Sequence, residues 1–502
     1  DVYRDSRKAV MRITMHSKLL VVALLAATSG AAQQPFDLDL SFRTTISERG
    51  IGEVYVLENG QIYITGYMIR YPGQLDSRSF LRINADGSRD DTFPDSNRGI
   101  GTITPWNGGY YVGGNPGVWR LFSDASRDTS FHHDYEGNQL YTTGQGADYH
   151  VNPDGSVIRT GTYTLNDPEH GFIGTHRLIF LTNTGHLDTT KTHRTGNANV
   201  WKIQTLSTGK LMCSIFGSQY DGQAVGPVFR IEPNGDLDPT FSALQIEWGY
   251  SYAFTELSDG KLLIGGNYRA VNHPDTICIA RLMPDGQPDP SFHLASFKSY
   301  IPFGGVQTVQ DILELPDHRL LTVGNFDTVD GYPRSGIVML HADGTVDSTV
   351  FNDAGCGPFN YQPNGPNGET YPARQIVGIT AGPDGNYYIF GSYVGYDDGT
   401  NNDPSQRFVS RMYGLSVGSA EHQQLHLTLY PNPATTAVTL QLENIPTNAT
   451  VIMRDALGRE VLQQRITRHY TILGTAGLGA GVYVVEVWES GQRVGVERVV
   501  VE

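Results

Sequence analysis

A unit of two consecutive β-hairpins recurs along most of this chain, and it constrains the fold more than any other feature. The clearest copy spans residues 257–292, where Asp259-Gly260 and Asp285-Gly286 each separate two short apolar runs. Glycine supplies the positive φ that a tight two-residue turn requires, so each Asp-Gly pair predicts a hairpin. Four short antiparallel strands cannot bury both of their faces alone, so the unit has to pack against copies of itself.

The first turn of the unit occurs seven times, at spacings of 47 to 67 residues. Its positions are Asn59-Gly60, Asn107-Gly108, Asp154-Gly155, Thr208-Gly209, Asp259-Gly260, Asp317-His318 and Asp384-Gly385. An apolar strand follows each turn, then a third strand and a closing segment such as Asp289–Phe292, with the sequence DPSF. Seven such copies predict an all-β protein, a seven-bladed β-propeller with four-stranded blades.

The two ends of the array predict how the ring closes. Residues 37–42 match a closing segment that has no unit before it, and the seventh unit has no closing segment after it. We therefore expect the N-terminal strand to complete the last blade and to remove an open sheet edge. Long irregular connections gather on one face of the predicted ring, and variable loops on a rigid scaffold commonly carry function.

Residues 1–32 have the composition of an upstream segment followed by a secretory signal peptide. Lys18 precedes the apolar run LLVVALLAA, and small residues at 29–32 are suited to cleavage. The apolar run is too short to span a bilayer, so we expect no transmembrane segment after signal cleavage.

Charge and cysteine content exclude several classes of partner. The net charge of −16 is spread along the chain, whereas nucleic acids and anionic membranes require clustered cations. Cys213 and Cys278 lie in apolar strands, Cys356 lies in a loop, and no Cys/His spacing indicates zinc. The composition fits an acidic, exported protein, which we expect to be a monomer.

The repeats resemble the delta-60 repeat β-propeller family over residues 36–415. The family pattern is a turn, a strand like LLIGGNF, and a tail of the form R-L-x-x-D-G-x-x-D-x-S-F, which residues 257–292 match well. The units that begin at Asn107, Asp154 and Asp384 are degenerate copies. The resemblance implies a propeller, assigned here to residues 33–415, and extracellular use, but no general activity.

After a polar linker at 416–424, residues 425–502 resemble the C-terminal type A sorting domain of type IX secretion substrates. The matching pieces are Tyr430-Pro431-Asn432-Pro433, then Asp455 with Gly458-Arg459, and then Gly481 with Tyr483. Period-two alternation fits an Ig-like β-sandwich of about seven short strands. The resemblance implies the type IX machinery as a partner. It also implies a protein secreted from, or held on the outer surface of, a Gram-negative bacterium.

We find no sequence signature of catalysis, so no catalytic residue is predicted. An oxygen-rich loop with Asp397, Asp398 and Asp403 could hold Ca²⁺, although it lacks the alternating spacing of an EF-hand and ordinary turn chemistry also explains it. No other cofactor is expected. Lys202 and Asp311, with Glu256, fall on predicted innermost strands and could line a wet channel.

Aromatic residues gather in or near the long connections. The predicted ligand-binding residues are Trp248, Tyr250, Tyr300, Phe303, Tyr361, Tyr371 and Tyr396. Exposed rings beside carboxylates and amides suit sugar rings or peptide segments, whereas buried rings would only pack the loops onto the blades.

Three functional hypotheses remain open from the sequence. The first is a non-catalytic module that binds an extracellular glycan or protein through the long-loop face. The second is a polysaccharide lyase or hydrolase at the channel mouth, which would need two carboxyl groups about 5–10 Å apart. The third is a structural display scaffold.

Overall fold

The computed structural model describes residues 34–502, apart from 49, 95, 98, 114–116, 133–139, 243–245, 272–274, 301–305, 362–370, 416–426, 443–448, 456–458, 467 and 490–491. The predicted leader, 1–32, and the predicted linker, 416–424, lie outside the described residues. Every regular element in the described part is a β-strand. A search of the same residues for a helix long and apolar enough to cross a membrane finds none.

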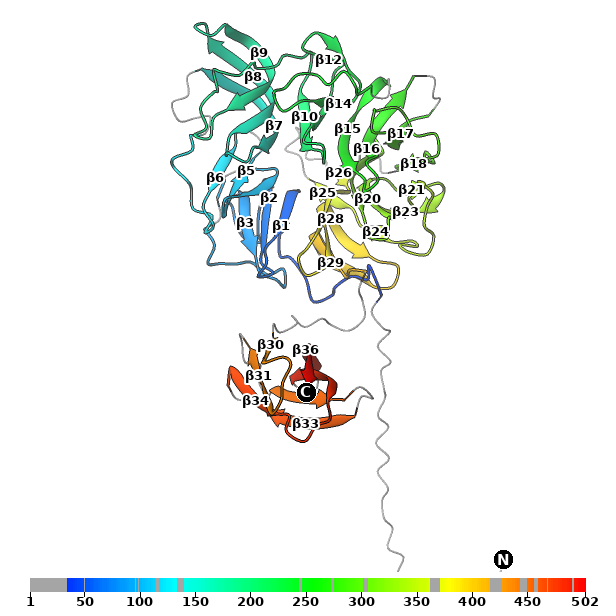
Figure 1. Ribbon diagram of the computed structural model, residues 1–502. Helices are drawn as coiled ribbons and strands as arrows, with labels where there is room; N and C mark the ends of the chain where they lie inside the picture. Colours follow the sequence, from blue (N-terminus) through cyan, green and yellow to red (C-terminus); the bar gives the residue numbers. More distant parts are fainter. Residues whose placement is uncertain are drawn as a thin grey trace, which may run out of the picture.

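Seven sheets follow one another around a common centre (Figure 1). The first three sheets comprise β1 (Ile51–Val56), β2 (Ile62–Ile69) and β3 (Arg78–Ile83); β4 (Ile103–Trp106), β5 (Gly109–Val112) and β6 (Trp119–Leu121); and β7 (Tyr141–Val151), β8 (Val157–Asp167) and β9 (Phe172–Leu181). The next two comprise β10 (Val200–Thr205), β11 (Leu211–Ile215) and β14 (Val228–Ile231); and β15 (Ile246–Glu256), β16 (Leu262–Ala270) and β17 (Ile277–Leu282).

The sixth and seventh sheets complete the series. They comprise β19 (Thr308–Glu314), β20 (Leu320–Asn325) and β23 (Ile337–Leu340); and β27 (Gln375–Ala381), β28 (Tyr387–Asp397) and β29 (Asn402–Met412) with the short β24 (Gly355–Cys356). Smaller ladders join β12 (Gln219–Tyr220) to β13 (Gln223–Ala224), β21 (Thr328–Val329) to β18 (Phe297–Lys298) and β22 (Tyr332–Pro333), and β25 (Phe359–Tyr361) to β26 (Tyr371–Ala373). The first strand of one sheet contacts that of the next at β7–β10, β10–β15, β15–β19, β19–β27, β27–β1 and β1–β4, which makes these strands innermost.

The hairpin turns differ from the predicted two-residue form. In the fifth sheet the amide of Leu257 donates to the carbonyl of Lys261, and the amide of Gly260 donates to the carbonyl of Leu257, both at 2.8 Å. This is a three-residue loop whose last residue needs a positive φ. Gly260 has a φ of 80°, and His318 takes the same place in the sixth unit with a φ of 65°.

The predicted fourth strand is a turn held by one bridge. In the fifth unit the closing segment pairs with the third strand only at Leu282 and Pro288, and the same single bridge recurs in the other units. The reason is local: Asp289 Oδ1 accepts hydrogen bonds from the amide (2.9 Å) and the hydroxyl (2.6 Å) of Ser291. Such side-chain bonding bends the backbone out of an extended path.

The closing aspartate and an arginine form what we call a clasp. Arg281 Nε donates to Asp289 Oδ2 at 2.8 Å, and its guanidinium lies 4.9 Å from the centre of the Phe292 ring. Arg281 Nη1 also donates to the carbonyl of Ala342 in the next unit. The equivalent pairs are Arg82–Asp90, Arg120–Asp128, Arg230–Asp238 and Arg411–Asp39. The clasps thus tie a sheet to its own closing segment and to its neighbour.

The sixth unit has no arginine on its third strand. Arg319, at the start of the second strand, replaces it and places Nη1 2.9 Å from Asp347 Oδ2. Lys261 reaches Asp289 from the equivalent place in the fifth unit, at 3.3 Å. Hydrogen bonds from Ser291, with Lys261 and the clasp arginine, hold the pKa of Asp289 well below its ordinary value, against the effect of burial.

The N-terminal segment pairs with the seventh sheet. The amide of Phe36 donates to the carbonyl of Tyr413, and the amide of Asp39 donates to the carbonyl of Arg411, both at 2.9 Å. Arg411 Nη1 continues to the carbonyl of Ala85 in the first unit at 2.8 Å. The first described residues therefore connect the last sheet to the first.

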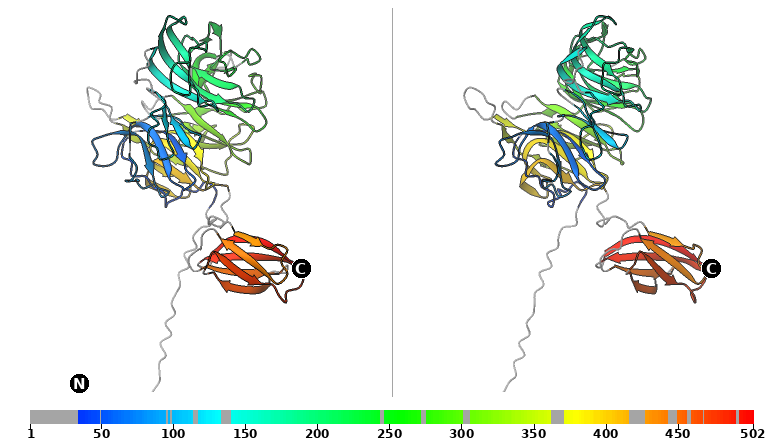
Figure 2. Two further views of the ribbon diagram at one scale, coloured as in Figure 1. Left: turned by 60° about the vertical axis from the view of Figure 1, so that its left-hand side comes forward. Right: turned by 90° about the vertical axis from the view of Figure 1, so that its left-hand side faces the viewer.

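The C-terminal unit contains two antiparallel sheets (Figure 2). One comprises β30 (Leu427–Tyr430), β31 (Ala437–Leu442) and β34 (Tyr470–Gly474); the other comprises β33 (Glu460–Arg465), β32 (Ala449–Arg454), β35 (Gly481–Glu489) and β36 (Gln492–Val501). Alternate apolar side chains of both sheets, among them Leu440, Val451 and Val485, form one buried core.

Candidate functional site

Four charged side chains occupy one position of the repeat on the innermost strands. They are Glu53 on β1, Asp148 on β7, Lys202 on β10 and Asp311 on β19. Each lies seven residues before the second residue of its unit's first turn. A register shift immediately precedes Glu53, Lys202 and Asp311, and such β-bulges re-aim side chains. As a result Trp201 and Lys202, although neighbours in sequence, both line one cavity.

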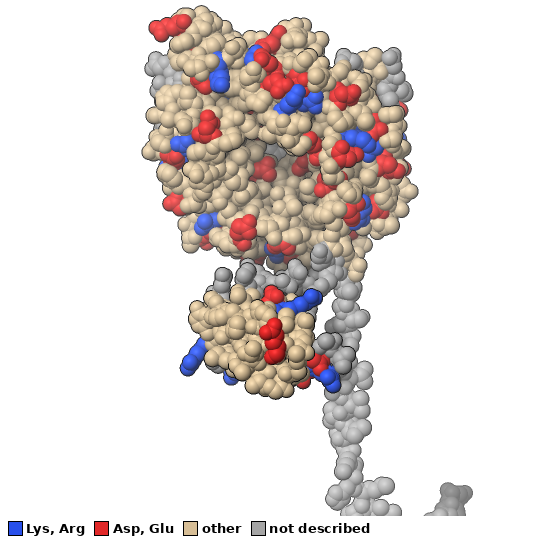
Figure 3. Space-filling view, in the orientation of Figure 1, with Lys and Arg blue, Asp and Glu red and all other residues tan. Residues whose placement is uncertain are grey.

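The four charged residues line a cavity of about 420 Å³ in the centre of the ring. Figure 3 shows acidic side chains in the central hollow. The other lining residues are Gly52, Ile100, Gly101, Thr102, Gln145, Gly146, Ala147, Trp201, Val377, Gly378 and Phe390. Gly101 and Gly378 occupy the repeat position of the charged residues in their own units, and their lack of a side chain leaves room between the charged groups.

Asp148 and Asp311 have both carboxylate oxygens engaged. One oxygen accepts from the amide of the following residue at 2.9 Å, and the other accepts from a neighbouring sheet. The cross-sheet donors are the amide of Ile203, 3.3 Å from Asp148 Oδ2, and that of Ile379, 2.9 Å from Asp311 Oδ2. Burial raises the pKa of both carboxyls, and the positive charge of Lys202 opposes that rise. These two aspartates fasten neighbouring sheets together.

Glu53 and Lys202 are less engaged. Among the described residues, the hydrogen-bond partner of the Glu53 carboxylate is the amide of Val54, at 3.2 Å. The ammonium of Lys202 makes no hydrogen bond or ion pair to another described residue. Burial raises the pKa of Glu53 to about 7; Lys202 lowers it, and Asp311 and Asp148 raise it further. The cavity therefore presents one acceptor that changes charge near neutrality and one cation with free donors.

Aromatic rings lead outward from the cavity wall. Trp201 and Phe216 stack with their ring centres 5.1 Å apart, Phe216 lies 4.7 Å from Tyr250, and Tyr250 lies 4.7 Å from Tyr252. We call these four rings the aromatic strip. Phe216 is 40% exposed, and Trp248, two residues before Tyr250 on β15, is 47% exposed. The strip joins solvent-exposed rings to Trp201 in the cavity.

Two of the sequence-predicted binding residues lie on or beside this strip. Tyr250 is a member, and Trp248 precedes it on the same strand. Tyr300 is 65% exposed, and its amide donates to Asp327. Phe303 lies outside the described residues.

The remaining predicted rings come from the seventh unit. Tyr361 and Tyr371 are cross-strand partners in the β25–β26 ladder. Tyr396 was expected in an exposed loop, but it belongs to β28 and is 1% exposed. Its hydroxyl lies 3.3 Å from the sulfur of Met412. Tyr396 is therefore a core residue and not a ligand contact.

The three carboxylates of the predicted calcium site have protein partners. Asp398 Oδ2 accepts from the amide of Leu38 at 2.6 Å, and Asp403 Oδ2 accepts from Arg43 Nε at 2.9 Å. Asp397 Oδ1 accepts from a backbone amide two residues later. Within the described residues no group of three or more His, Cys, Asp or Glu side chains is placed to hold a metal ion. The geometry gives the calcium hypothesis no support.

The sequence argument identified part of the cavity and missed the rest. Of the three residues expected on the channel, Lys202 and Asp311 line the cavity. Glu256 instead accepts from the amide (2.6 Å) and hydroxyl (2.7 Å) of Ser207 in the neighbouring turn. Glu53, Asp148 and Trp201 were not predicted, although the fixed offset from the turn identifies Glu53 and Asp148.

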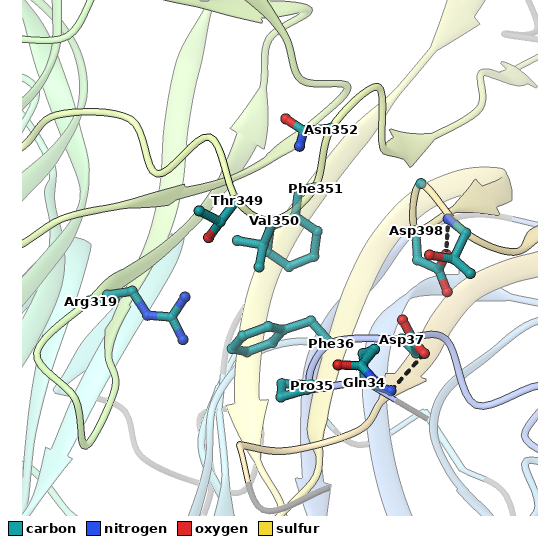
Figure 4. A pocket seen from close by; sticks show the side chains of 12 residues that line it. Gln34, Pro35, Phe36, Asp37, Arg319, Thr349, Val350, Phe351, Asn352 and Asp398 are labelled. Carbon is teal, nitrogen blue, oxygen red and sulfur yellow. Dashed lines mark hydrogen bonds between the residues drawn. The ribbon is translucent and has the colours of Figure 1, made fainter. Parts of the chain in front are cut away.

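A second cavity, of about 380 Å³, lies where the N-terminal segment meets the sixth and seventh units (Figure 4). Phe36 and Phe351 pack there with ring centres 5.6 Å apart, and the Arg319 guanidinium lies 5.5 Å from the Phe36 ring. Burial, with a contribution from Asp398, raises the pKa of Asp37. These residues join the ends of the ring, so we assign this cavity to the seam rather than to a ligand.

The predicted sorting-motif residues hold the C-terminal unit together. Asn432 donates from Nδ2 to the carbonyl of Arg498 and accepts on Oδ1 from the amide of Val500, both at 2.9 Å. Tyr430 is exposed beside it at the end of β30, and Pro431 and Pro433 flank the asparagine. The asparagine thereby docks the chain entry onto the last strand.

The other motif pieces act locally. Asp455 Oδ2 accepts from Arg459 Nε at 2.7 Å, which closes the β32–β33 turn. Gly458 lies outside the described residues. Gly481 starts β35, and the buried Tyr483 donates its hydroxyl to the carbonyl of Gly479 at 2.8 Å.

Comparison with known protein families agrees with both resemblances. Residues 57–93, 257–292 and 315–349 match the β-propeller domain of unknown function DUF5122. Residues 428–502 match the secretion system C-terminal sorting domain. No curated protein matches the chain significantly.

Several solved structures align with this chain at low similarity. PorZ, a surface component of the type IX secretion system of Porphyromonas gingivalis, is 14% identical with a TM-score of 0.35; the alignment covers 90% of this chain and 66% of PorZ. A protein of unknown function from Bacteroides thetaiotaomicron is 11% identical with a TM-score of 0.34, covering 76% and 74%. The Pan2 WD40 domain of Neurospora crassa is 7% identical with a TM-score of 0.33, covering 72% and 89%. TM-scores this low do not by themselves establish a shared fold.

The sorting domain indicates type IX secretion to the cell surface or the extracellular space. The repeats, the all-β architecture and the C-terminal match together identify the chain as a β-propeller protein that carries a type IX secretion sorting domain.

Proposed function

We propose that this protein is an exported, non-catalytic binding module that takes an extracellular ligand at the mouth of its central channel. One observation supports this most strongly. The partly engaged Glu53 and the unpaired Lys202 share a cavity with Trp201, whose ring begins the aromatic strip. Concave sites with a few convergent polar groups and aromatic walls are the usual form of small-ligand sites.

We also propose the number of propeller blades and the type of the C-terminal domain. Seven sheets with one closing segment each support a seven-bladed propeller over residues 33–415, with the N-terminal segment completing the last blade. Seven strands in two packed sheets support an Ig-like sandwich over 425–502, joined by the 416–424 linker. A leader at 1–32 and handling by the type IX machinery then deliver the propeller outside the cell.

The hydrogen bonds of the channel favour binding over catalysis. Asp148 and Asp311 each use one oxygen to accept from the next amide of their own strand and the other to accept from an amide of a neighbouring sheet, so both carboxylates already have structural partners. Glu53 is the exception, because a carboxyl with a pKa of about 7 can serve as a general acid or base. A hydrolase or lyase that uses Glu53 is therefore the second candidate function.

The test is a printed array of glycans and extracellular proteins probed with the purified full-length chain, with and without calcium. We expect a defined set of hits that the double substitution F216A/Y250A reduces at least tenfold. Tyr470→Ala is the control, because Tyr470 is an exposed ring of the C-terminal unit. An array with no hits would contradict the proposal, and turnover of a polysaccharide that E53Q abolishes would favour the enzyme.

A further inference from the structure

The charges of the cavity restrict the chemistry of its ligand. Three carboxylates and one ammonium surround it, so an anionic ligand would meet a net negative wall. A cationic ligand would meet the ammonium of Lys202, which forms no ion pair with a carboxylate of the described residues. Because screening by water is reduced in a partly buried site, the wall repels an anion, and Lys202 repels a cation placed beside it even though the carboxylates attract that cation. A neutral ligand avoids both costs.

The hydrogen-bonding groups point to hydroxyls. Lys202 offers ammonium donors and no acceptor, whereas the Glu53 carboxylate is mainly an acceptor. A ligand that satisfies both at one place must accept from one and donate to the other, which a hydroxyl does with a single oxygen. Asp148 and Asp311 already accept hydrogen bonds from backbone amides. They add negative charge to the cavity, but their oxygens are engaged.

The aromatic strip favours a ligand made of several linked rings, each with a flat, apolar face. The ring of Trp201 is part of the cavity wall and stacks on Phe216, which in turn contacts Tyr250. The C–H faces of sugar rings pack well on such side chains, which combine an apolar face with polar edges. A cavity of about 420 Å³ is near the lower end of the roughly 300–1,000 Å³ range of ligand pockets, so it suits a chain end.

From these observations we infer that the channel cavity binds the terminal residue of a neutral oligosaccharide. Hydroxyls of that residue bridge Lys202 and Glu53, its ring lies against Trp201, and the following residues lie along the aromatic strip. This inference rests on the proposed binding function and narrows it to one ligand class and one orientation, with the chain end innermost.

The experiment uses the whole secreted chain and an array of neutral, acidic and amino-bearing oligosaccharides, followed by calorimetric titration with the strongest neutral hit. We expect binding confined to neutral oligosaccharides, weakened at least tenfold by Lys202→Met and several-fold by Glu53→Gln. Lys298→Met is the matched control, because Lys298 is exposed on β18, and should leave the affinity unchanged. A cyclic oligosaccharide of the same sugar, which has no end, should not bind.

Trp201 supplies an independent readout. Ligand binding should change the tryptophan fluorescence, and Trp201→Phe, which keeps a ring of similar shape, should remove that change while unfolding at the temperature of the wild type. Hits limited to acidic saccharides or to proteins would overturn the inference and leave the binding function standing. Binding of a neutral oligosaccharide with an affinity that neither Lys202→Met nor Trp201→Phe changes would also overturn the inference and leave the binding function standing. No binding to any class would overturn both.

Discussion

The clasps and the channel both carry a carboxylate at a fixed position of the repeat, but the two carboxylates differ in how many hydrogen-bond donors surround them. In the clasps, Asp289 is surrounded by donors: a hydroxyl, an amide, a lysine and an arginine. In the channel, Glu53 has one amide partner and two carboxylates nearby. The clasp holds the pKa of Asp289 far below its ordinary value, whereas the channel raises that of Glu53 to about 7. A carboxylate with several hydrogen-bond donors, such as Asp289, stabilises this fold. A carboxylate with one donor, such as Glu53, can accept further hydrogen bonds from a ligand.

The largest expected effect comes from breaking a clasp. We expect Arg281→Ala to lower the free energy of unfolding of the propeller by about 3–5 kcal/mol, because the buried Asp289 carboxylate loses its guanidinium partner. Urea unfolding measures this. Arg269→Ala is the control: Arg269 pairs with Glu247 at 3.2 Å, but both side chains are more than 40% exposed, so the loss should stay below about 1 kcal/mol. Equal losses in the two variants would contradict the contrast.

The channel carboxylate should respond to pH in the opposite way from a clasp aspartate. Because the folded-state pKa of Glu53 is raised from 4.5 to about 7, its contribution to stability is fully present below pH 4.5 and is lost as the pH rises through 7. We expect wild type to lose about 2–3 kcal/mol relative to Glu53→Gln between pH 4.5 and pH 8.

The exposed Glu58, five residues away on the first turn, supplies the control for that measurement. Unfolding of Glu58→Gln should follow the wild-type curve across the same pH range. If the difference between wild type and Glu53→Gln does not change with pH, the raised pKa of Glu53 is wrong.

The smallest effect concerns one hydrogen bond of a clasp. Ser291→Ala removes the hydroxyl that donates to Asp289 Oδ1 at 2.6 Å, and we expect a loss of about 1–2 kcal/mol in the unfolding free energy, since the acceptor is charged. Ser242→Ala, at an exposed serine, should change stability little. A loss in Ser291→Ala as small as that in the control would mean that the guanidinium alone holds the clasp.

The first three strands of each unit could be predicted from the sequence, because the position of each turn and the apolar run after it are local signals; the predicted fourth strand was wrong, since it is a turn held by one bridge. The side-chain contacts that replace one another between units could not be predicted. Arg319 replaces a third-strand arginine from a different strand, and no spacing rule within one unit reveals that exchange. Tyr396 looked exposed because it precedes an Asp-Asp-Gly sequence, but β28 runs on through it to Asp397. Whether the Tyr396 side chain is exposed depends on where β28 ends, and the local sequence does not determine that end.

The candidate site was predictable only in part for a related reason. A bulge on β10 brings Trp201 and Lys202 into the same cavity, whereas simple alternation would send them to opposite faces. Phe216 follows the end of β11, the hairpin partner of β10, and joins the strip through packing on Trp201. Comparing equivalent positions across all seven units finds the charged residues, but the rings that accompany them follow no repeat position.

The pairing of Phe36 with Tyr413 has a consequence for export. The peptide that enters the ring and the peptide that leaves it are hydrogen-bonded neighbours, so both described ends of the propeller lie at one place. Cleavage on the N-terminal side of Phe36, or on the C-terminal side of Tyr413, cuts no hydrogen bond between these two residues. If the predicted leader and the sorting domain are removed by proteolysis outside Phe36 and Tyr413, we therefore expect the ring to stay closed.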